Sequence, residues 1–187
     1  LGNPGRRYAH TRHNVGFRVA ETLARRLGAR FSSGLGGEVE MARARAGDEE
    51  IVIAKPLNWM NRSGDAAVRL AQLLGSAPEE LIVAYDDIAL PLGAVRVRTG
   101  GRSAGQKGMQ SIIQSLGTDV IPRVRCGILG TRGEEDLADY VLDPFLVAEQ
   151  ETAAAMIERG ADATLVILEQ GIEKAMRLYN RRDPVEA

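Results

Sequence analysis

The sequence contains two histidines, His10 and His13, which lie just ahead of a predicted helix. Histidine is the side chain best suited to act as a general base near neutral pH, because its ordinary pKa of ~6.5 lets it take up and release a proton there. A histidine-dependent reaction of this chain must therefore use one of these two residues. A histidine in a loop can equally be structural or incidental, and the two residues alone leave that alternative open.

Asp86 is a predicted partner for one of the histidines. It follows a continuous apolar run at 81–85, which is typical of a strand buried on both faces. A carboxylate in that position can accept a hydrogen bond from an imidazole, which fixes the imidazole tautomer and raises its basicity. The alternative is an aspartate that only caps the turn before Leu90-Pro91.

The sequence indicates direct attack by water rather than a covalent or metal-assisted reaction. The lone cysteine, Cys126, lies within an apolar strand, where a buried and inert thiol is expected. Two histidines three residues apart without a clustered carboxylate make a poor zinc site, so no metal is predicted. Asn3 and Asn61 are candidates for binding the substrate and stabilising an oxyanion, because asparagine offers neutral donors and acceptors. Asparagine is also common in turns, which is the alternative for each.

A glycine-rich and basic run extends from Arg98 to Gly108 and leads into a predicted helix. Backbone amides and the positive end of a helix suit such a run to phosphate binding. The run lacks the Walker A pattern, because Gln106 stands where lysine is required, so a nucleotide-binding module is a weak hypothesis. A surface loop without a ligand is the other alternative. The arginines predicted to contact a phosphate backbone are Arg96, Arg98, Arg102, Arg123 and Arg125.

The formal net charge of −1 conceals a segregated distribution. Residues 1–33 and 91–133 each carry a net charge of +6, whereas residues 134–170 carry −9. Most of the basic residues are arginine, whose planar fork suits phosphate. A genome of high GC content explains the preference for arginine equally well, but it does not explain the segregation. The two basic blocks therefore predict a polyanionic partner.

Strands and helices alternate along the chain and must position these residues. Apolar positions at helical spacing predict helices at 15–28, 63–74, 107–116, 147–170 and 172–180. Alternating or continuous apolar runs predict strands at 37–46, 51–54, 81–85, 94–98 and 124–129. Asn14 and Ser63 are predicted to cap the first two helices. Ligands of α/β sheets bind beyond the carboxyl ends of strands, where Asn3, the turn 59–61 and Asp86 are expected.

This alternation, without a repeat or a linker, predicts a single α/β domain over residues 1–187. We expect a mixed, mostly parallel twisted sheet with helices on both faces. The segment Leu1–Gly5 has the composition of a turn without a strand to feed it, so the first strand is expected to be truncated. No apolar run approaches the ~20 residues of a membrane span, and a lone cysteine suits the reducing cytoplasm.

Taken together, these segments resemble the bacterial peptidyl-tRNA hydrolase family. Three blocks carry most of the resemblance, namely Asn3-Pro4-Gly5-x-x-Tyr8, Thr11-Arg12-His13-Asn14 and Met60-Asn61-x-Ser63-Gly64. Further matches follow in the expected order and cover most of the chain, at Pro56, Asp86-Asp87, Leu90-Pro91-Leu92-Gly93, Gly105–Gly108, Arg123–Ile128 and Tyr140–Leu142.

The resemblance implies a cytoplasmic monomer that cleaves the ester between a peptide and the ribose of tRNA, and so recycles tRNA from peptidyl-tRNA released by stalled ribosomes. It implies His13 as the catalytic base, oriented by Asp86. It further implies that Asn3 and Asn61 bind and polarise the peptide. Tyr8 and Met60 are expected to line the cleft. The basic strands and loop would hold the acceptor stem, and neither a metal, an organic cofactor nor a membrane is expected to take part.

The sequence departs from the family where the usual Gly-Gly-His-Asn-Gly is replaced by Ala104-Gly105-Gln106-Lys107-Gly108. We assign Lys107 to substrate binding, either as a phosphate contact or as a donor to the oxyanion. The departure keeps a second hypothesis open, namely a non-catalytic RNA-binding relative on the same scaffold. His13 and Asp86 are both intact and favour the enzyme.

Overall fold

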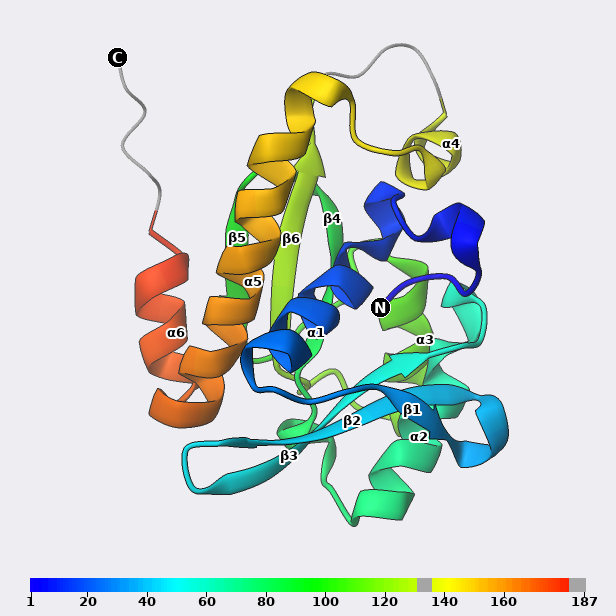
Figure 1. The fold of residues 1–187 in the computed structure, drawn as a ribbon, viewed down its shortest axis with the longest axis vertical. Helices are drawn as coiled ribbons and strands as arrows, with labels where there is room; N and C mark the ends of the chain where they lie inside the picture. Colours follow the sequence, from blue (N-terminus) through cyan, green and yellow to red (C-terminus); the bar gives the residue numbers. More distant parts are fainter. Residues whose placement is uncertain (131–135, 182–187) are drawn as a thin grey trace.

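The computed structural model describes residues 1–130 and 136–181, shown in Figure 1. The α-helices in this part are α1 Val15–Arg26, α2 Ser63–Leu74, α3 Lys107–Leu116, α4 Leu137–Leu142, α5 Gln150–Gln170 and α6 Ile172–Tyr179. The strands are β1 Ser32–Gly34, β2 Val39–Ala46, β3 Glu49–Pro56, β4 Val83–Pro91, β5 Val95–Arg98 and β6 Arg123–Leu129. Strands and helices thus alternate, and the α/β class is confirmed.

The strands form two three-stranded sheets, ordered β1-β2-β3 and β4-β6-β5. The crossover through α3 makes β4 and β6 parallel, whereas the short turn at 92–94 reverses the chain into β5, which is antiparallel to β6. In the other sheet the Gly47-Asp48 turn joins β2 to β3 as a hairpin, which only antiparallel strands can form. The prediction of one mostly parallel sheet is therefore wrong. There are two sheets, and among the described strands only β4 and β6 pair in parallel.

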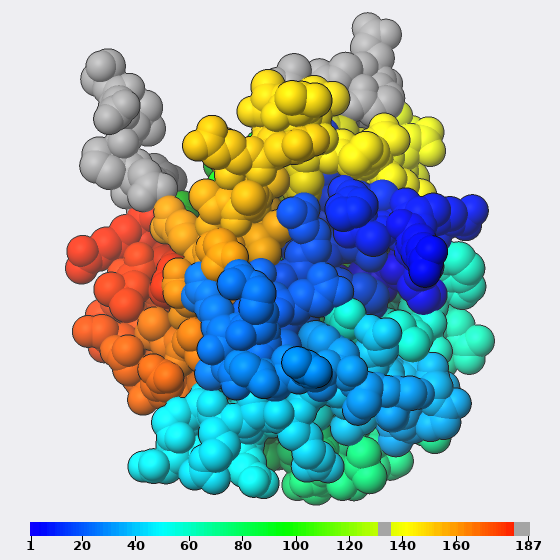
Figure 2. Space-filling model, in the orientation of Figure 1, coloured from blue at the N-terminus to red at the C-terminus, as the bar shows by residue number. Residues whose placement is uncertain are grey.

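Helices cover both faces of the β4-β6-β5 sheet, as expected. On one face, Val15 and Val19 of α1 and Met156 of α5 pack against Val97 and Val124. On this face α1 and α5 lie in front of the sheet and largely hide it (Figures 1 and 2). Burying such a side chain fully contributes about 1.5–3 kcal/mol. None of the described helices is both long and apolar enough to cross a bilayer.

The second face of the sheet is covered mainly by α3. Met109 and Ile112 of this helix pack against Val83 and Tyr85 of β4. Helix α2 packs against α3. Met60, in the turn just ahead of α2, belongs to the same cluster as Met109. Helices α1 and α3 thus pack near opposite faces of β4, and its buried polar residues Asp86 and Asp87 lie between the two helices.

The sequence predicted a strand at 81–85 that ends at Asp86, and this end is wrong. Strand β4 continues through Asp86 and Asp87. Their backbones pair with Cys126 and Gly127 of β6, and the register becomes irregular only between Asp87 and Pro91. A strand tolerates two buried carboxylates here because both accept hydrogen bonds, as described below. Two short elements were not predicted: β1, and α4, whose six residues are too few to show a helical period.

Candidate active site

His13 and Asp86 form a hydrogen-bonded pair between α1 and β4. His13 lies in the short 3-10 turn Arg12–Asn14 ahead of α1. Its Nδ1 is 2.7 Å from Oδ2 of Asp86, and the two side chains are 12% and 4% exposed. Because the carboxylate accepts, Nδ1 carries the proton and Nε2 keeps its lone pair. His10 is exposed in the preceding turn, so the structure brings only His13 to the carboxylate.

Gln106 joins this pair from the start of α3 and was not predicted as a site residue. Its Nε2 donates to the other carboxylate oxygen, Oδ1 of Asp86, at 3.0 Å, and lies 3.4 Å from Sδ of Met60. Its Oε1 accepts the backbone N–H of Met109 at 2.7 Å and caps α3. The sequence analysis weighed Gln106 only as a departure from the Walker A and family patterns. Glutamine is not among the residues that favour the N-cap position, so no sequence pattern indicated where its amide would lie.

Asn3 is held beside the pair by Asn14 and Met60. Backbone N–H of Asn3 donates to Oδ1 of Asn14 at 2.9 Å, and Nδ2 of Asn14 donates to the Asn3 carbonyl at 3.0 Å. Asn14 occupies the N-cap position of α1, but its side chain makes these bonds instead of a cap. Oδ1 of Asn3 accepts the N–H of Met60 at 2.9 Å. The Nδ2 of Asn3 is therefore left as a donor without a partner among the described residues.

The remaining predicted cleft residues, Tyr8 and Asn61, lie in the short 3-10 turns that follow Asn3 and begin at Met60. Tyr8 and Trp59 meet edge to face with ring centroids 5.9 Å apart, and Trp59 is 51% exposed. Met60 is buried, whereas Asn61 is exposed at the surface of the same turn. Ser63 does not cap α2 but is its first residue, and its hydroxyl donates to the Met60 carbonyl. The turn 59–62 is thus fastened from both ends and presents Trp59 and Asn61 outward.

Arg12 fastens the His13 turn to the segment around α4. Its guanidinium donates to Oε2 of Glu149 at 2.7 Å and to the carbonyl of Pro144 at 2.7 Å. It also lies over the ring of Tyr140, with Cζ 4.2 Å from the centroid. Arg12 is 2% exposed, and these contacts replace the hydration of its two terminal nitrogens only in part, since its Nε is buried without a hydrogen-bond partner. The residue next to the candidate base is therefore anchored in the core.

Three of the predicted basic residues present their charge to solvent. Arg98, Arg102 and Lys107 are exposed, at the end of β5, in the following loop and at the start of α3. Arg96 is half-buried, and its guanidinium donates to the carbonyl of Tyr179 at 2.9 Å, at the end of α6. The exposed residues follow the chain from β5 to α3, close to where Gln106 meets Asp86.

The other two predicted phosphate contacts are engaged within the protein. Arg123 is 1% exposed, and its guanidinium donates to three backbone carbonyls, those of Arg102, Asp119 and Ile121. Arg125 pairs with Asp87, with Nε and Oδ2 2.5 Å apart. Arg123 therefore does not present its guanidinium to a ligand in this structure but braces the loop that carries Arg102. Arg123 was predicted to be accessible, but the alternation of side chains along a strand does not show which face of the strand is buried.

A possible nucleophile pattern occurs in the loop between β5 and α3. Gly101-Arg102-Ser103-Ala104-Gly105 has the order Gly-x-Ser-x-Gly, which in some hydrolases places a serine on a sharp turn beside a histidine. Here Ala104 and Gly105 form a turn, closed by a hydrogen bond from the Gln106 N–H to the Ser103 carbonyl, and no hydrogen bond joins Ser103 to either histidine. The inert thiol predicted for Cys126 is confirmed, because complete burial raises the pKa of Cys126 to about 12. Neither residue is placed as an activated nucleophile.

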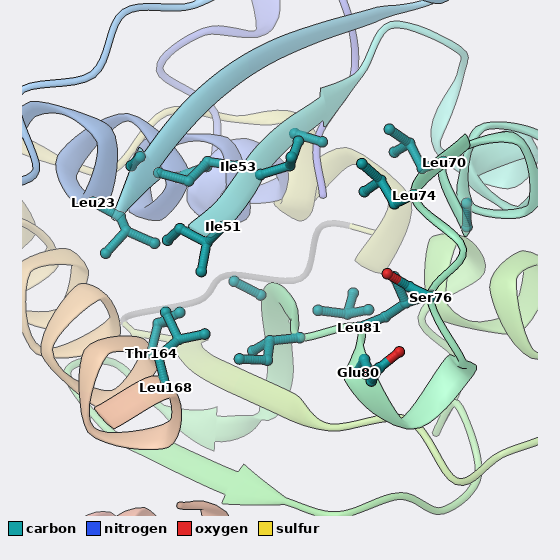
Figure 3. Close-up of a pocket in the computed structure, with 18 of the residues that line it drawn as sticks. Leu23, Ile51, Ile53, Leu70, Leu74, Ser76, Glu80, Leu81, Thr164 and Leu168 are labelled. Atoms are coloured by element: carbon teal, nitrogen blue, oxygen red, sulfur yellow. The ribbon is translucent and has the colours of Figure 1, made fainter. Parts of the chain in front are cut away.

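A pocket of about 700 Å³ lies between the two sheets, away from His13 and Asp86. Its labelled residues, including Leu23, Ile53, Leu70 and Leu81, point toward a common space between β3, α2 and α5 (Figure 3). The lining is mainly aliphatic, and none of the predicted catalytic residues contributes to it. Among the described residues, no group of three or more His, Cys, Asp or Glu is placed to hold a metal ion. The predicted catalytic residues His13 and Asp86 therefore lie outside this pocket.

Comparison with known proteins assigns the family. The model of the family described as "Peptidyl-tRNA hydrolase" matches residues 1–186. The chain belongs to the peptidyl-tRNA hydrolase family. A peptidyl-tRNA hydrolase from Thermodesulfovibrio yellowstonii is 41% identical over 97% of this chain and 96% of its own length. One from Mycobacterium tuberculosis is 43% identical over 94% of this chain and 92% of its own length.

A solved structure of a peptidyl-tRNA hydrolase has the same fold. The enzyme from Acinetobacter baumannii superposes with a TM-score of 0.90 at 28% identity, covering 99% of this chain and 94% of that one. The resemblance drawn from the sequence blocks is thereby confirmed, and the comparisons favour the hydrolase over the nucleotide-binding hypothesis. Within the peptidyl-tRNA hydrolase fold, the hydrogen-bonded set of this chain comprises His13, Asp86, Gln106, Asn3, Asn14 and Met60.

Proposed function

We propose that this chain hydrolyses the ester that joins a peptide to tRNA, with His13 as the general base. The observation that carries the proposal is the 2.7 Å contact between Nδ1 of His13 and Oδ2 of Asp86, which leaves Nε2 free to accept a proton. The family and its curated relatives support the same reaction and favour the enzyme over an RNA-binding protein without activity.

In the proposed reaction a water molecule donates a proton to Nε2 of His13 while its oxygen attacks the ester carbonyl carbon. Asp86 stabilises the imidazolium that forms, through the hydrogen bond at Nδ1. The carbonyl oxygen becomes an oxyanion, and the free Nδ2 of Asn3 is the donor we assign to it or to the adjoining peptide. The tetrahedral intermediate then breaks the bond to the ribose oxygen, which takes the proton from His13 and leaves as the tRNA hydroxyl.

The surroundings of this centre support binding of both halves of the substrate. Tyr8, Met60 and Asn61 are assigned to the peptide side, with the exposed Trp59 beside them. For the acceptor stem we keep the exposed basic residues, which are Arg98, Arg102 and Lys107. Arg96 and Arg125, whose guanidinium groups already bind the Tyr179 carbonyl and Asp87, are kept at the edge of this patch, whereas Arg123 is assigned to bracing the loop. We expect the enzyme to act as a cytoplasmic monomer that returns tRNA from released peptidyl-tRNA.

The test is hydrolysis of an N-blocked aminoacyl-tRNA by the purified protein and by His13→Ala. General-base catalysis contributes about 10²–10⁴-fold, so His13→Ala should lower kcat by that factor. His10→Ala is the matched control, since His10 is an exposed histidine in the preceding turn, and it should keep wild-type kcat. Tight binding of the tRNA without any turnover by the wild-type chain would overturn the proposal and identify an RNA-binding protein.

A further inference from the structure

We infer that Gln106 is a positioning residue for the reaction, which holds the Asp86 carboxylate so that it presents Oδ2 to His13. The inference rests on the proposed function and assigns a task to one member of the replaced Gln106-Lys107 pair. Gln106 contacts Asp86, not the reacting atoms, so it acts through the His13–Asp86 pair.

The orientation of the Gln106 amide follows from its two partners. A backbone N–H can only donate, so the bond from the Met109 N–H identifies the facing atom of Gln106 as Oε1. Nε2 must then point the other way, and it lies 3.0 Å from Oδ1 of Asp86. The bond that caps α3 therefore turns a donor, and never an acceptor, toward the carboxylate.

The two oxygens of Asp86 are thereby given separate partners. Oδ1 accepts from Gln106 and Oδ2 accepts from His13, and the side chain of Asp86 is 4% exposed, so water competes poorly for either oxygen. A buried carboxylate held by two donors cannot rotate without losing one of them. Gln106 thus fixes the plane of the carboxylate, and the carboxylate fixes the tautomer and direction of the His13 ring.

Gln106 also links this pair to the substrate side of the site. The same Nε2 lies 3.4 Å from Sδ of Met60, whose backbone N–H holds the side chain of Asn3. A Cβ at Gly108 would come within 2.4 Å of the same sulfur, so the start of α3 is packed tightly against Met60. Gln106, at the start of the helix that carries Lys107, therefore contacts both Asp86, which binds the base, and Met60, which binds the proposed oxyanion donor Asn3.

The test is Gln106→Ser, because serine keeps the N-cap acceptor of α3 but is too short to reach Asp86. We expect kcat to fall about 10- to 100-fold, the range of one hydrogen bond to a charged group, with KM nearly unchanged. A spectroscopic signature accompanies the loss. With ¹⁵N-labelled histidine, wild-type His13 should be the Nδ1–H tautomer, and Gln106→Ser should raise the Nε2–H share. His10 is exposed and serves as the internal reference.

Two further variants separate positioning from folding. Gln106→His restores a donor that can reach Asp86 and should recover most of kcat and of the Nδ1–H tautomer. Gln114→Ser changes an exposed glutamine of the same helix and should leave kcat and both histidine spectra as in the wild type. If Gln106→Ser fails to fold, Gln106→Glu keeps the size and the cap acceptor while turning an acceptor toward Asp86, and should lose at least as much kcat.

The outcomes distinguish this inference from the proposed function. Wild-type kcat and tautomer in Gln106→Ser, alongside a His13→Ala variant that is inactive, would overturn the role of Gln106 alone. An Nε2–H tautomer of His13 in the wild-type protein would overturn both, because Nδ1 would then not donate to Asp86. A loss of kcat without any change in the His13 spectrum would also overturn the inference, since positioning through Asp86 must alter the imidazole.

Discussion

Asp86 accepts hydrogen bonds from two donors, and this makes Asp86→Asn a sharp test at the scale of one residue. The Nε2 of Gln106 can only donate, so it would bind the carbonyl oxygen of the new amide. The NH2 group of that new amide would then face Nδ1 of His13. Nδ1 would then accept, and the imidazole proton would move to Nε2, where the base is needed. We expect kcat to fall about 10²–10⁴-fold with KM little changed, as for the wrong tautomer in a Ser-His-Asp site.

Steady-state hydrolysis of N-blocked aminoacyl-tRNA measures this effect, with Asp87→Asn as the matched control. Asp87 is the next residue of β4, is also buried, and pairs with Arg125 instead of His13. Its substitution removes the same charge from the same strand but leaves the imidazole bond intact. Equal losses of kcat in the two variants would show that Asp86 acts through charge or folding rather than through the tautomer.

The sequence was sufficient to predict the His13–Asp86 pair, but not the contacts of Gln106 with Asp86 and of Asn14 with Asn3. A histidine and a carboxylate indicate acid–base chemistry by their residue type alone. Gln106 and Asn14 are neutral polar residues, and what they do depends on partners that are distant in the sequence. Arg123 shows the reverse error. It was predicted to contact phosphate because it is cationic, yet burial commits its guanidinium to backbone carbonyls. Side-chain type limits the possible chemistry, and burial selects among the possibilities.

At the scale of elements, Arg12 joins the turn that carries His13 to the segment between α4 and α5. Its pair with Glu149 is buried, with side chains 3% and 8% exposed. Removing one partner of a buried pair costs about 3–5 kcal/mol, because the other charge stays desolvated. We therefore expect Arg12→Met to lower the free energy of unfolding by about this amount and to reduce kcat, since the His13 turn loses its anchor.

Chemical denaturation of wild type and variant gives the difference in unfolding free energy, and Arg25→Met supplies a matched control. Arg25 pairs with Glu158 between α1 and α5, but the two side chains are 67% and 44% exposed. Exposed pairs contribute about 0–1 kcal/mol, so this variant should be nearly as stable as the wild type and fully active. A loss of stability from Arg12→Met no larger than that from Arg25→Met would contradict the anchoring role.

The element boundaries show where local patterns are sufficient. Helices α1, α2 and α3 begin where the apolar period predicted, because each covers one face of the core with residues at helical spacing. The end of β4 was missed because Asp86 and Asp87 interrupt the apolar run while the backbone pairing continues. Strand direction was misjudged for a similar reason. Alternation of helix and strand favours parallel sheets, but short turns such as Gly47-Asp48 reverse the chain.

At the scale of the whole molecule, exposed basic residues of the segment 91–133 begin beside the His13–Asp86 pair. Arg98, Arg102 and Lys107 are exposed along the chain from β5 to α3, and Gln106 in the same segment contacts Asp86. If these three residues contact phosphates, each releases counterions, and the logarithm of the binding constant falls with the logarithm of salt by about 0.7–0.9 per contact. Binding should therefore weaken steeply between low and moderate salt.

The triple variant Arg98→Gln, Arg102→Gln and Lys107→Gln tests this surface, and should lower the salt slope by about 2–3 while weakening binding at low salt. Affinity is measured for N-blocked aminoacyl-tRNA in a His13→Ala background, so that the ester survives. The control carries Arg30→Gln, Arg43→Gln and Arg45→Gln, which remove the same charge from exposed positions around β1 and β2. Because the net charge changes equally, an equal drop in slope for both triples would mean that total charge and not this surface attracts the tRNA. A reduced slope in the first triple alone places the acceptor stem along the β5–α3 segment, where a phosphate backbone leads directly to the His13 side chain.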